Sequence, residues 1–159
     1  MLTVAAVFKD GRTVPSTEVT EVMAELLDLK PGEKLMEIGT GSGSQTEFWL
    51  RTGAEVHTIE CRPVIDPERK GPEQCYAHLG DGKRGIPQEA PFDAVVVTCG
   101  VKGGPEKIPS AWVAQLREGG RIVVPLGNVM NQRLVLLRKV GGQLDPVKTA
   151  AYVRFSMLE

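Results

Sequence analysis

A glycine-rich stretch with acids around it is the part of this sequence best suited to bind a small ligand. The segment KLMEIGTGSGSQ (34–45) places Gly39, Gly41 and Gly43 directly behind an apolar run that contains Glu37. A second acid, Glu60, ends the next apolar run. Glycines at such a turn let the backbone approach a ligand closely, so the segment predicts a binding loop.

The loop lacks what phosphate-binding loops need. A P-loop requires GxxxxGK[ST], and no lysine stands between Lys34 and Lys70. The dinucleotide pattern GxGxxG would need a glycine where the chain has Ser44 or Thr46. A carboxylate at the end of the next strand, Glu60, is placed to accept hydrogen bonds from both hydroxyls of a ribose. The pattern favours a nucleoside that carries a cation, and S-adenosyl-L-methionine is such a ligand.

The elements that must position this loop alternate between strand and helix. Apolar runs predict strands at residues 34–38, 55–60, 92–100 and 121–127. Helical periodicity predicts helices in residues 16–32, with Ser16 or Thr17 as the N-cap and Pro31-Gly32 as the stop, and in residues 45–51 and 110–116. Residues 61–79 are ambiguous because four proline and glycine residues interrupt them.

Both ends of the chain carry β signals. Two short β-prone runs around Asp10-Gly11 predict an N-terminal hairpin, and QRLVLLRKV and AYVRFSM, joined through Gly141-Gly142, predict a closing antiparallel pair. The expected fold is one α/β domain over residues 1–159, Rossmann-like, with a mostly parallel twisted sheet and helices on both faces. Because ligands bind at the carboxyl ends of such strands, GTGSGSQ, Glu60, Gly80-Asp81-Gly82 and Thr98-Cys99-Gly100 should converge.

These segments also carry a family resemblance. LKPGEKLMEIGTGSGSQT, HTIE, GDGKRGIP, PFDAVVVTCG, IPSAWVAQLREGGRIVVPLG, NQRLVLLRK and YVRF follow in order the pattern of protein-L-isoaspartate O-methyltransferases, from about Val14 to Phe155. The resemblance implies a class I methyltransferase that binds S-adenosyl-L-methionine and methylates a carboxylate. It implies that the loop contacts the methionine part, that Glu60 contacts the ribose, and that Asp81 and Gly82 lie near the adenine.

The candidate site residues follow from the loop and from this resemblance. The expected cofactor-binding residues are Glu37, Gly39, Thr40, Gly41, Ser42, Gly43, Gln45, Glu60, Cys61, Asp81, Gly82 and Thr98. The expected catalytic residues are Thr98, at the reaction edge, and Ser16, which stands one step after the place where the family has an active-site serine. That place is occupied here by Pro15.

The departures from the family pattern gather on the substrate side. Family members are usually longer at the N-terminus, where a further segment covers the active site, so a second copy or another chain is expected to supply that cover. Ser44 replaces the usual tyrosine of the loop, residues 60–80 are shorter, and VTCGVKGGPEKIP is longer. Two other functions therefore stay open: a small-molecule or natural-product O-methyltransferase, and a non-catalytic S-adenosylmethionine-binding module.

The remaining composition narrows the class of protein. With 19 basic and 20 acidic residues the net charge is −1, so no nucleic-acid or membrane partner is expected, and the first fourteen residues resemble no signal peptide. A cytoplasmic protein with reduced, mostly buried Cys61, Cys75 and Cys99 is expected. An ionised carboxylate needs no general base to accept a methyl group, which suits a chain whose histidines are only His57 and His78. No metal site is expected.

Overall fold

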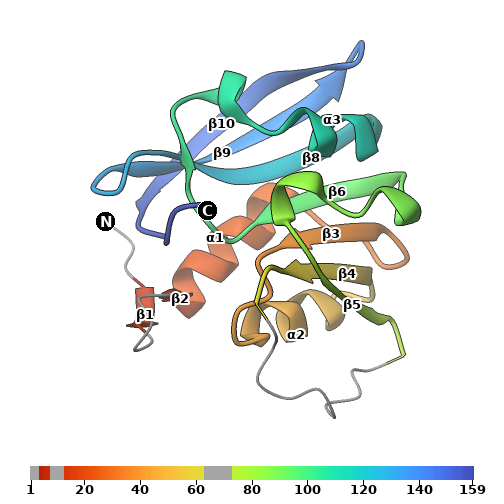
Figure 1. Cartoon of the computed structure of the whole chain (residues 1–159), viewed down its shortest axis with the longest axis horizontal. Helices are drawn as coiled ribbons and strands as arrows, with labels where there is room; N and C mark the ends of the chain where they lie inside the picture. Colours follow the sequence, from red (N-terminus) through yellow and green to blue (C-terminus); the bar gives the residue numbers. More distant parts are fainter. Residues whose placement is uncertain (1–3, 8–12, 63–72) are drawn as a thin grey trace.

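A computed structural model describes residues 4–7, 13–62 and 73–159 of the chain. The strands of its main sheet are β3 (Lys34–Ile38), β4 (Glu55–Glu60), β5 (Cys75–Leu79), β6 (Phe92–Val97), β7 (Val101–Lys102), β8 (Leu116–Gly127), β9 (Gln132–Val140) and β10 (Gln143–Val153). They lie in the order β10-β9-β8-β6-β3-β4-β5, and β7 pairs with β8 beside this path (Figure 1).

The direction of the strands confirms the predicted architecture. The pairs β3–β4, β4–β5, β3–β6 and β6–β8 are parallel, whereas β9 and β10 form the predicted closing antiparallel pair. From β3 the chain builds outward through β4 to β5 and then returns to β6 on the other side of β3. This reversal creates a crevice at the carboxyl ends of β3 and β6, where ligands bind in open α/β sheets.

Helices cover both faces of the sheet, as predicted. Helices α1 (Thr17–Leu27) and α2 (Ser44–Leu50) pack on one face, where Met23 and Trp49 join a buried cluster with Val96. Helix α3 (Ser110–Gln115) packs on the other face, where Trp112 contacts a cluster that includes Val97. The short 3-10 helices η1 (Gly82–Arg84), η2 (Pro87–Glu89) and η3 (Pro105–Lys107) adjoin Ile86 and Ile108, which belong to the same cluster as Trp112. Both tryptophans are fully buried and anchor these two layers.

Helix α1 begins where its sequence predicts and ends earlier. The hydroxyl of Ser16 accepts the N–H of Val19 at 3.3 Å, which makes Ser16 the N-cap. The helix ends at Leu27 because Asp28 turns into the left-handed region, with φ 45°, rather than at the predicted Pro31-Gly32 stop. The guanidinium of Arg121 donates to the carbonyls of Leu27 and Asp28, at 2.5 and 2.9 Å. A buried cation from β8 therefore satisfies the last carbonyls of the helix.

Other predicted boundaries also differ from the structure. The strand expected to run through residues 92–100 ends at Val97, because the N–H of Gly100 bonds to the carbonyl of Ser156 instead of a sheet neighbour. Helix α3 ends at Gln115, and β8 begins at the next residue, Leu116, rather than at the predicted residue 121. Strand β10 lies at Gln143–Val153, ahead of the predicted AYVRFSM.

The predicted N-terminal hairpin is present as a separate two-stranded sheet. Strands β1 (Val4–Val7) and β2 (Thr13–Pro15) pair antiparallel, while the Asp10-Gly11 turn and residues 63–72 of the ambiguous segment lie outside the described residues. Across the described ranges, no helix combines the length and apolar character required to cross a bilayer.

Candidate active site

The predicted binding segments converge on one cavity of about 500 Å³ at the carboxyl edge of the sheet. Segments that follow β3, β4, β5 and β6 all contribute to its wall, so the expected convergence is observed. Of the predicted site residues, those that line the cavity are Gly39, Thr40, Gly41, Ser42, Gln45, Glu60, Cys61, Asp81, Gly82 and Thr98.

Glu60 organises the backbone around the cavity. Its side chain is buried at the end of β4, and Oε2 accepts the N–H of Gly41 at 2.9 Å. Its Oε1 accepts the N–H groups of Cys61 and Arg62, at 3.0 and 3.3 Å. The Cys61 thiol also lies 3.3 Å from Oε1, so Oε1 is fully engaged. Of the about four acceptor positions of a carboxylate, one on Oε2 remains for a hydroxyl donor from a ligand. One acid thus ties the glycine loop to β4 and presents negative charge to the cavity.

Thr98 fixes the start of the glycine loop from the neighbouring strand. Its hydroxyl lies 2.9 Å from the carbonyl oxygen of Ile38 and 2.6 Å from that of Gly39. Gly39 has φ 95°, and a Cβ at this position would come within 2.5 Å of the Thr98 hydroxyl. The close approach of these two segments therefore requires glycine at position 39.

Gln45 lines the cavity, but its unpaired acceptor atom is closed off from solvent. Its Nε2 donates to the hydroxyl of Thr20 at 3.0 Å, while its buried Oε1 has no hydrogen-bond partner among the described residues. A buried acceptor without a partner costs roughly 1–3 kcal/mol, and at Gln45 this cost arises behind the surface of the cavity.

The far part of the cavity is apolar. Ile38, Ile59 and Leu79 line it, and Leu79 is 68% exposed at the end of β5. A Cβ at Gly82 would come within 3.0 Å of Ile38 Cγ2. The glycine therefore allows the start of η1 to pack close to the sheet. The side chain of Asp81 accepts the N–H of Lys83 at 2.9 Å and starts η1. This largely apolar part of the lining suits an adenine base.

The charges around the cavity also fit the cofactor. Among the described residues that line it there is no lysine, and its basic residue, Arg62, is paired with Glu159 at 3.0 Å. A buried carboxylate in a lining whose described residues include no lysine suits a cationic nucleoside better than a nucleotide carrying phosphates. The donor, acceptor and apolar groups present therefore fit S-adenosylmethionine.

Three predicted site residues lie outside the lining. Ser16 caps α1 with its hydroxyl, and Gly43 is the N-cap of α2, with φ 80°. Glu37 is fully buried beneath the loop and accepts a hydrogen bond from the Thr46 hydroxyl at 2.5 Å. Burial raises the pKa of Glu37 to about 7, and the nearby charge of Glu60 adds to the shift. Glu37 thus supports the loop from below.

One wall of the cavity has no signal in the sequence. Residues Ser156–Glu159 and β2 line the side next to Thr98-Cys99-Gly100. The N–H of Ser156 donates to the Thr13 hydroxyl at 3.2 Å, and the N–H of Leu158 donates to the carbonyl of Gly100 at 2.8 Å. No local pattern signals these contacts, which join the two ends of the chain.

The cysteines differ in exposure. All three are free thiols, but Cys61 is exposed and Cys75 and Cys99 are half-buried, so the expectation of mostly buried thiols is wrong for Cys61. Cys61 is exposed because the chain leaves the sheet directly after Glu60, at the mouth of the cavity. Burial raises the pKa of the Cys99 thiol to about 12, which leaves it protonated and unreactive at neutral pH.

Comparisons with known proteins agree with this geometry. The family model described as Protein-L-isoaspartate(D-aspartate) O-methyltransferase matches residues 3–158. A protein-L-isoaspartate O-methyltransferase of Christiangramia forsetii is 34% identical over 154 residues, which cover 93% of this chain and 70% of that relative. A relative with the same name from Chromobacterium violaceum is 40% identical over 151 residues. These residues cover 87% of this chain and 65% of the relative.

A solved structure of a protein-L-isoaspartate O-methyltransferase superposes with a TM-score of 0.82 at 27% identity. The match covers 98% of this chain and 51% of the solved one, so this chain spans about half the length of that protein. The chain therefore belongs to the protein-L-isoaspartate O-methyltransferase family of S-adenosylmethionine-dependent methyltransferases.

Proposed function

We propose that this protein binds S-adenosyl-L-methionine in the cavity and methylates the side-chain carboxylate of an isoaspartyl residue in a peptide or protein. The observation that carries the proposal is the position of Glu60, buried at the end of β4 and bonded to the loop amide of Gly41 at 2.9 Å. Family membership adds the reaction and the acceptor class.

Different residues of the cavity are proposed to contact different parts of the cofactor. In the proposed complex, Oε2 of Glu60 accepts a hydrogen bond from a ribose hydroxyl. Ile59 and Leu79 contact the adenine, and Gly39 to Gly43 approach the methionine part through their backbone. Because Thr98 and Glu60 already hold the loop in place, little ordering remains to be done on binding.

When bound, S-adenosylmethionine supplies a methyl group on a sulfonium, and the transfer of that group to a carboxylate oxygen leaves a methyl ester and S-adenosylhomocysteine. The acceptor is ionised at neutral pH, so the protein needs no general base. Its task is to exclude water and to hold the two reactants in line, which the apolar wall of Ile38, Met157 and Leu158 supports.

The acceptor is proposed to enter beside β2. Pro15 and Thr13 line the cavity together with Thr98 and the glycine loop. The two proposed catalytic residues have hydroxyls that are already engaged: Thr98 bonds to Gly39, and Ser16 caps α1. We therefore propose Thr98 as a residue that positions the loop, and an acceptor contact by Ser16 would have to compete with its capping bond.

A methylation assay tests the proposal. The protein is incubated with S-adenosylmethionine labelled in the methyl group and with a peptide that contains one isoaspartyl residue. We expect a base-labile methyl ester on this peptide and much less on the same peptide with a normal aspartyl residue. Calorimetry with S-adenosylmethionine and S-adenosylhomocysteine measures cofactor binding separately.

The outcomes separate the alternatives. Binding of neither nucleoside would overturn the cofactor site. Binding without ester on any carboxylate would leave a non-catalytic binding module, and ester on small carboxylic acids but not on the peptide would indicate a small-molecule O-methyltransferase.

We also propose that the protein works in the cytoplasm, which is supported by its free thiols Cys61, Cys75 and Cys99.

A further inference from the structure

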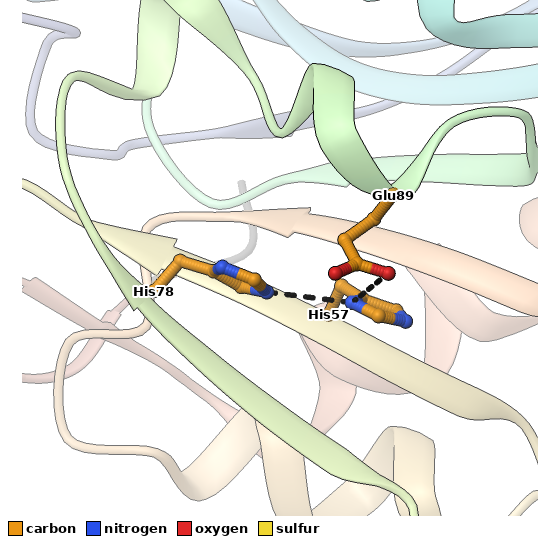
Figure 2. A group of neighbouring side chains, drawn as sticks. All are labelled: His57, His78 and Glu89. Carbon is orange, nitrogen blue, oxygen red and sulfur yellow. Dashed lines mark hydrogen bonds and ion pairs between the residues drawn. The ribbon is translucent and has the colours of Figure 1, made fainter.

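A second group of side chains with ligand chemistry lies away from the cofactor cavity. His57 on β4, His78 on β5 and Glu89 at the end of η2 point toward one another, as Figure 2 shows. We propose that these three residues form a site for a divalent transition metal, with Zn²⁺ as the ion it best fits. The proposed methyl transfer uses none of these residues.

The distances between the ligand atoms are close to those that a bound zinc ion requires. One ligand atom from each residue lies within 4.8 Å of the other two, and His57 Nδ1 is 3.4 Å from His78 Nε2. Tetrahedral zinc with bonds of about 2.0–2.2 Å holds its ligand atoms roughly 3.4 Å apart. The histidine pair already has this spacing. Glu89 Oε2 lies 3.9 Å from His57 Nδ1, and its half-exposed side chain is free to move closer.

The orientation of His57 favours metal binding. Its Nε2 lies 2.7 Å from a carboxylate oxygen of Glu55, which favours the tautomer with the proton on Nε2 and the lone pair of Nδ1 toward His78. A bound ion would displace the proton that His78 Nε2 shares with Nδ1. The imidazole ring is stacked on the ring of Tyr76, with 4.7 Å between the ring centroids. It makes a T-shaped contact with the ring of Phe92, with 5.7 Å between the centroids. A carboxylate behind a fixed histidine is the usual outer partner of a metal-binding imidazole.

The charges around the site suit a divalent cation. The ammonium of Lys34 lies 3.8 Å from the carboxylates of both Glu55 and Glu89. These two acids and one base leave a single negative charge beside two histidines, so a bound divalent ion would not face a net positive site. His57 is buried, whereas His78 and Glu89 are half-exposed, which gives an ion a route from solvent.

A bound ion would link the connection between β5 and η2 to the sheet. His78 and Glu89 stand at the two ends of a connection that carries Asp81 and Gly82, two residues of the cofactor cavity. An ion held by both, and by His57 on the sheet, would clip this connection to β4. Metal clips of this kind stabilise a fold by restricting the unfolded chain as well as by their bonds. Three ligands with one open position are also the arrangement of zinc sites that keep a bound water.

Metal titration of the full chain tests the proposal. After treatment with a chelator, the protein is titrated with ZnCl₂ in a calorimeter and with CoCl₂ in a spectrophotometer. We expect one ion per chain, an absorption band of tetrahedral cobalt, and no thiolate-to-cobalt band, because the ligands are nitrogen and oxygen. Zinc should also raise the Tm of the wild type.

Variants at the half-exposed ligands identify the site. His78→Ala and Glu89→Gln should each weaken zinc binding at least roughly tenfold and reduce the zinc-dependent rise in Tm. The matched control is Glu25→Gln, which removes the same charge from an exposed position on α1, on the other face of the sheet. It should bind zinc as the wild type does. Circular dichroism without metal confirms that each variant is folded.

Two results would overturn the proposal. The first is a wild type that binds neither ion, which would leave a hydrogen-bonded histidine pair. The second is a folded His78→Ala variant whose zinc affinity and Tm shift match those of the wild type. His57 is left unchanged in these experiments because its burial among aromatic rings makes any substitution there a test of folding.

Discussion

The hydroxyl of Thr98 lies 2.6 Å from the carbonyl oxygen of Gly39 and would lie 2.5 Å from a Cβ at that position. One contact thus joins the end of β6 to the start of the glycine loop and leaves no room for any residue but glycine. The loop that the sequence marks by its composition is held in shape by a residue from a distant strand.

Substitution of this glycine should damage both the fold and the site. We expect Gly39→Ala to reduce the free energy of unfolding by about 1–3 kcal/mol, because the position has φ 95° and the new methyl group meets Thr98. Urea unfolding measures the loss, and calorimetry should show weaker binding of S-adenosylmethionine. Gly32→Ala is the matched control, with φ 83° and no atom within 4 Å of the added Cβ. Equal losses in the two variants would show that the contact with Thr98 costs nothing.

Removal of the Thr98 hydroxyl should act on cofactor binding rather than on the chemical step. Thr98→Val keeps the shape of the side chain and removes the donor to Ile38 and Gly39. We expect a higher KM for S-adenosylmethionine with a nearly unchanged kcat, and Thr98→Ser should restore the wild-type KM because it keeps the hydroxyl. A lower kcat at unchanged KM would instead assign Thr98 a part in the transfer itself.

Loss of the Glu60 carboxylate should weaken cofactor binding. Glu60→Ala removes the proposed ribose contact and the bonds to Gly41 and Cys61, so we expect the affinity for S-adenosylmethionine to fall at least tenfold, about 1.4 kcal/mol. Calorimetry measures the change. Glu25→Ala, an exposed position on α1, serves as the control and should bind the cofactor normally. An unchanged affinity in Glu60→Ala would disprove the assigned ribose position.

The buried carboxyl of Glu37 should make stability depend on pH. Its pKa is raised by burial from 4.5 to about 7, so the folded state holds the proton more tightly than the unfolded chain does. The stability that this protonated carboxyl contributes is complete below about pH 4.5 and is lost as the pH rises to about 7. Over this range the loss amounts to about 3 kcal/mol.

Glu37→Gln isolates this effect, because the amide is uncharged and still accepts a bond from Thr46. Urea unfolding of both proteins between pH 4.5 and 8 should show the wild type losing stability relative to the variant as the pH rises. A constant difference between the two proteins across this range would mean that Glu37 keeps the same pKa in the folded and unfolded chains.

The wall formed by residues 156–159 should depend on one buried side chain. Gln132 accepts the N–H of Phe155 and donates to the carbonyl of the same residue, both at 2.9 Å. Gln132→Leu leaves these two buried backbone groups without partners, so we expect a loss of roughly 2–4 kcal/mol in thermal or urea unfolding. It should also weaken cofactor binding, since the segment that follows Phe155 lines the cavity.

The comparison for Gln132→Leu is Gln143→Leu, which makes the same chemical change at an exposed position of β10. This variant should unfold and bind the cofactor much as the wild type does. If the two leucine variants were equally stable, the buried bonds to Phe155 would contribute nothing to the fold.

By itself, the sequence determined the parallel part of the sheet, the glycine loop and the convergence of the segments that hold Glu60, Asp81 and Thr98. These features rest on local patterns, namely apolar runs, glycines and helix caps. A general rule of topology then places the carboxyl ends of parallel strands at one edge.

Tertiary structure alone decided the features that depend on contacts between distant residues. Arg121 ends α1, Ser156 closes the cavity beside Thr13, and His57, His78 and Glu89 meet across two strands and a 3-10 helix. No local pattern encodes these contacts, because each depends on the register of the strands and on how the connections fold back. The same holds for Glu37, which the sequence marks as an acid beside a binding loop and which burial places beneath it as a support.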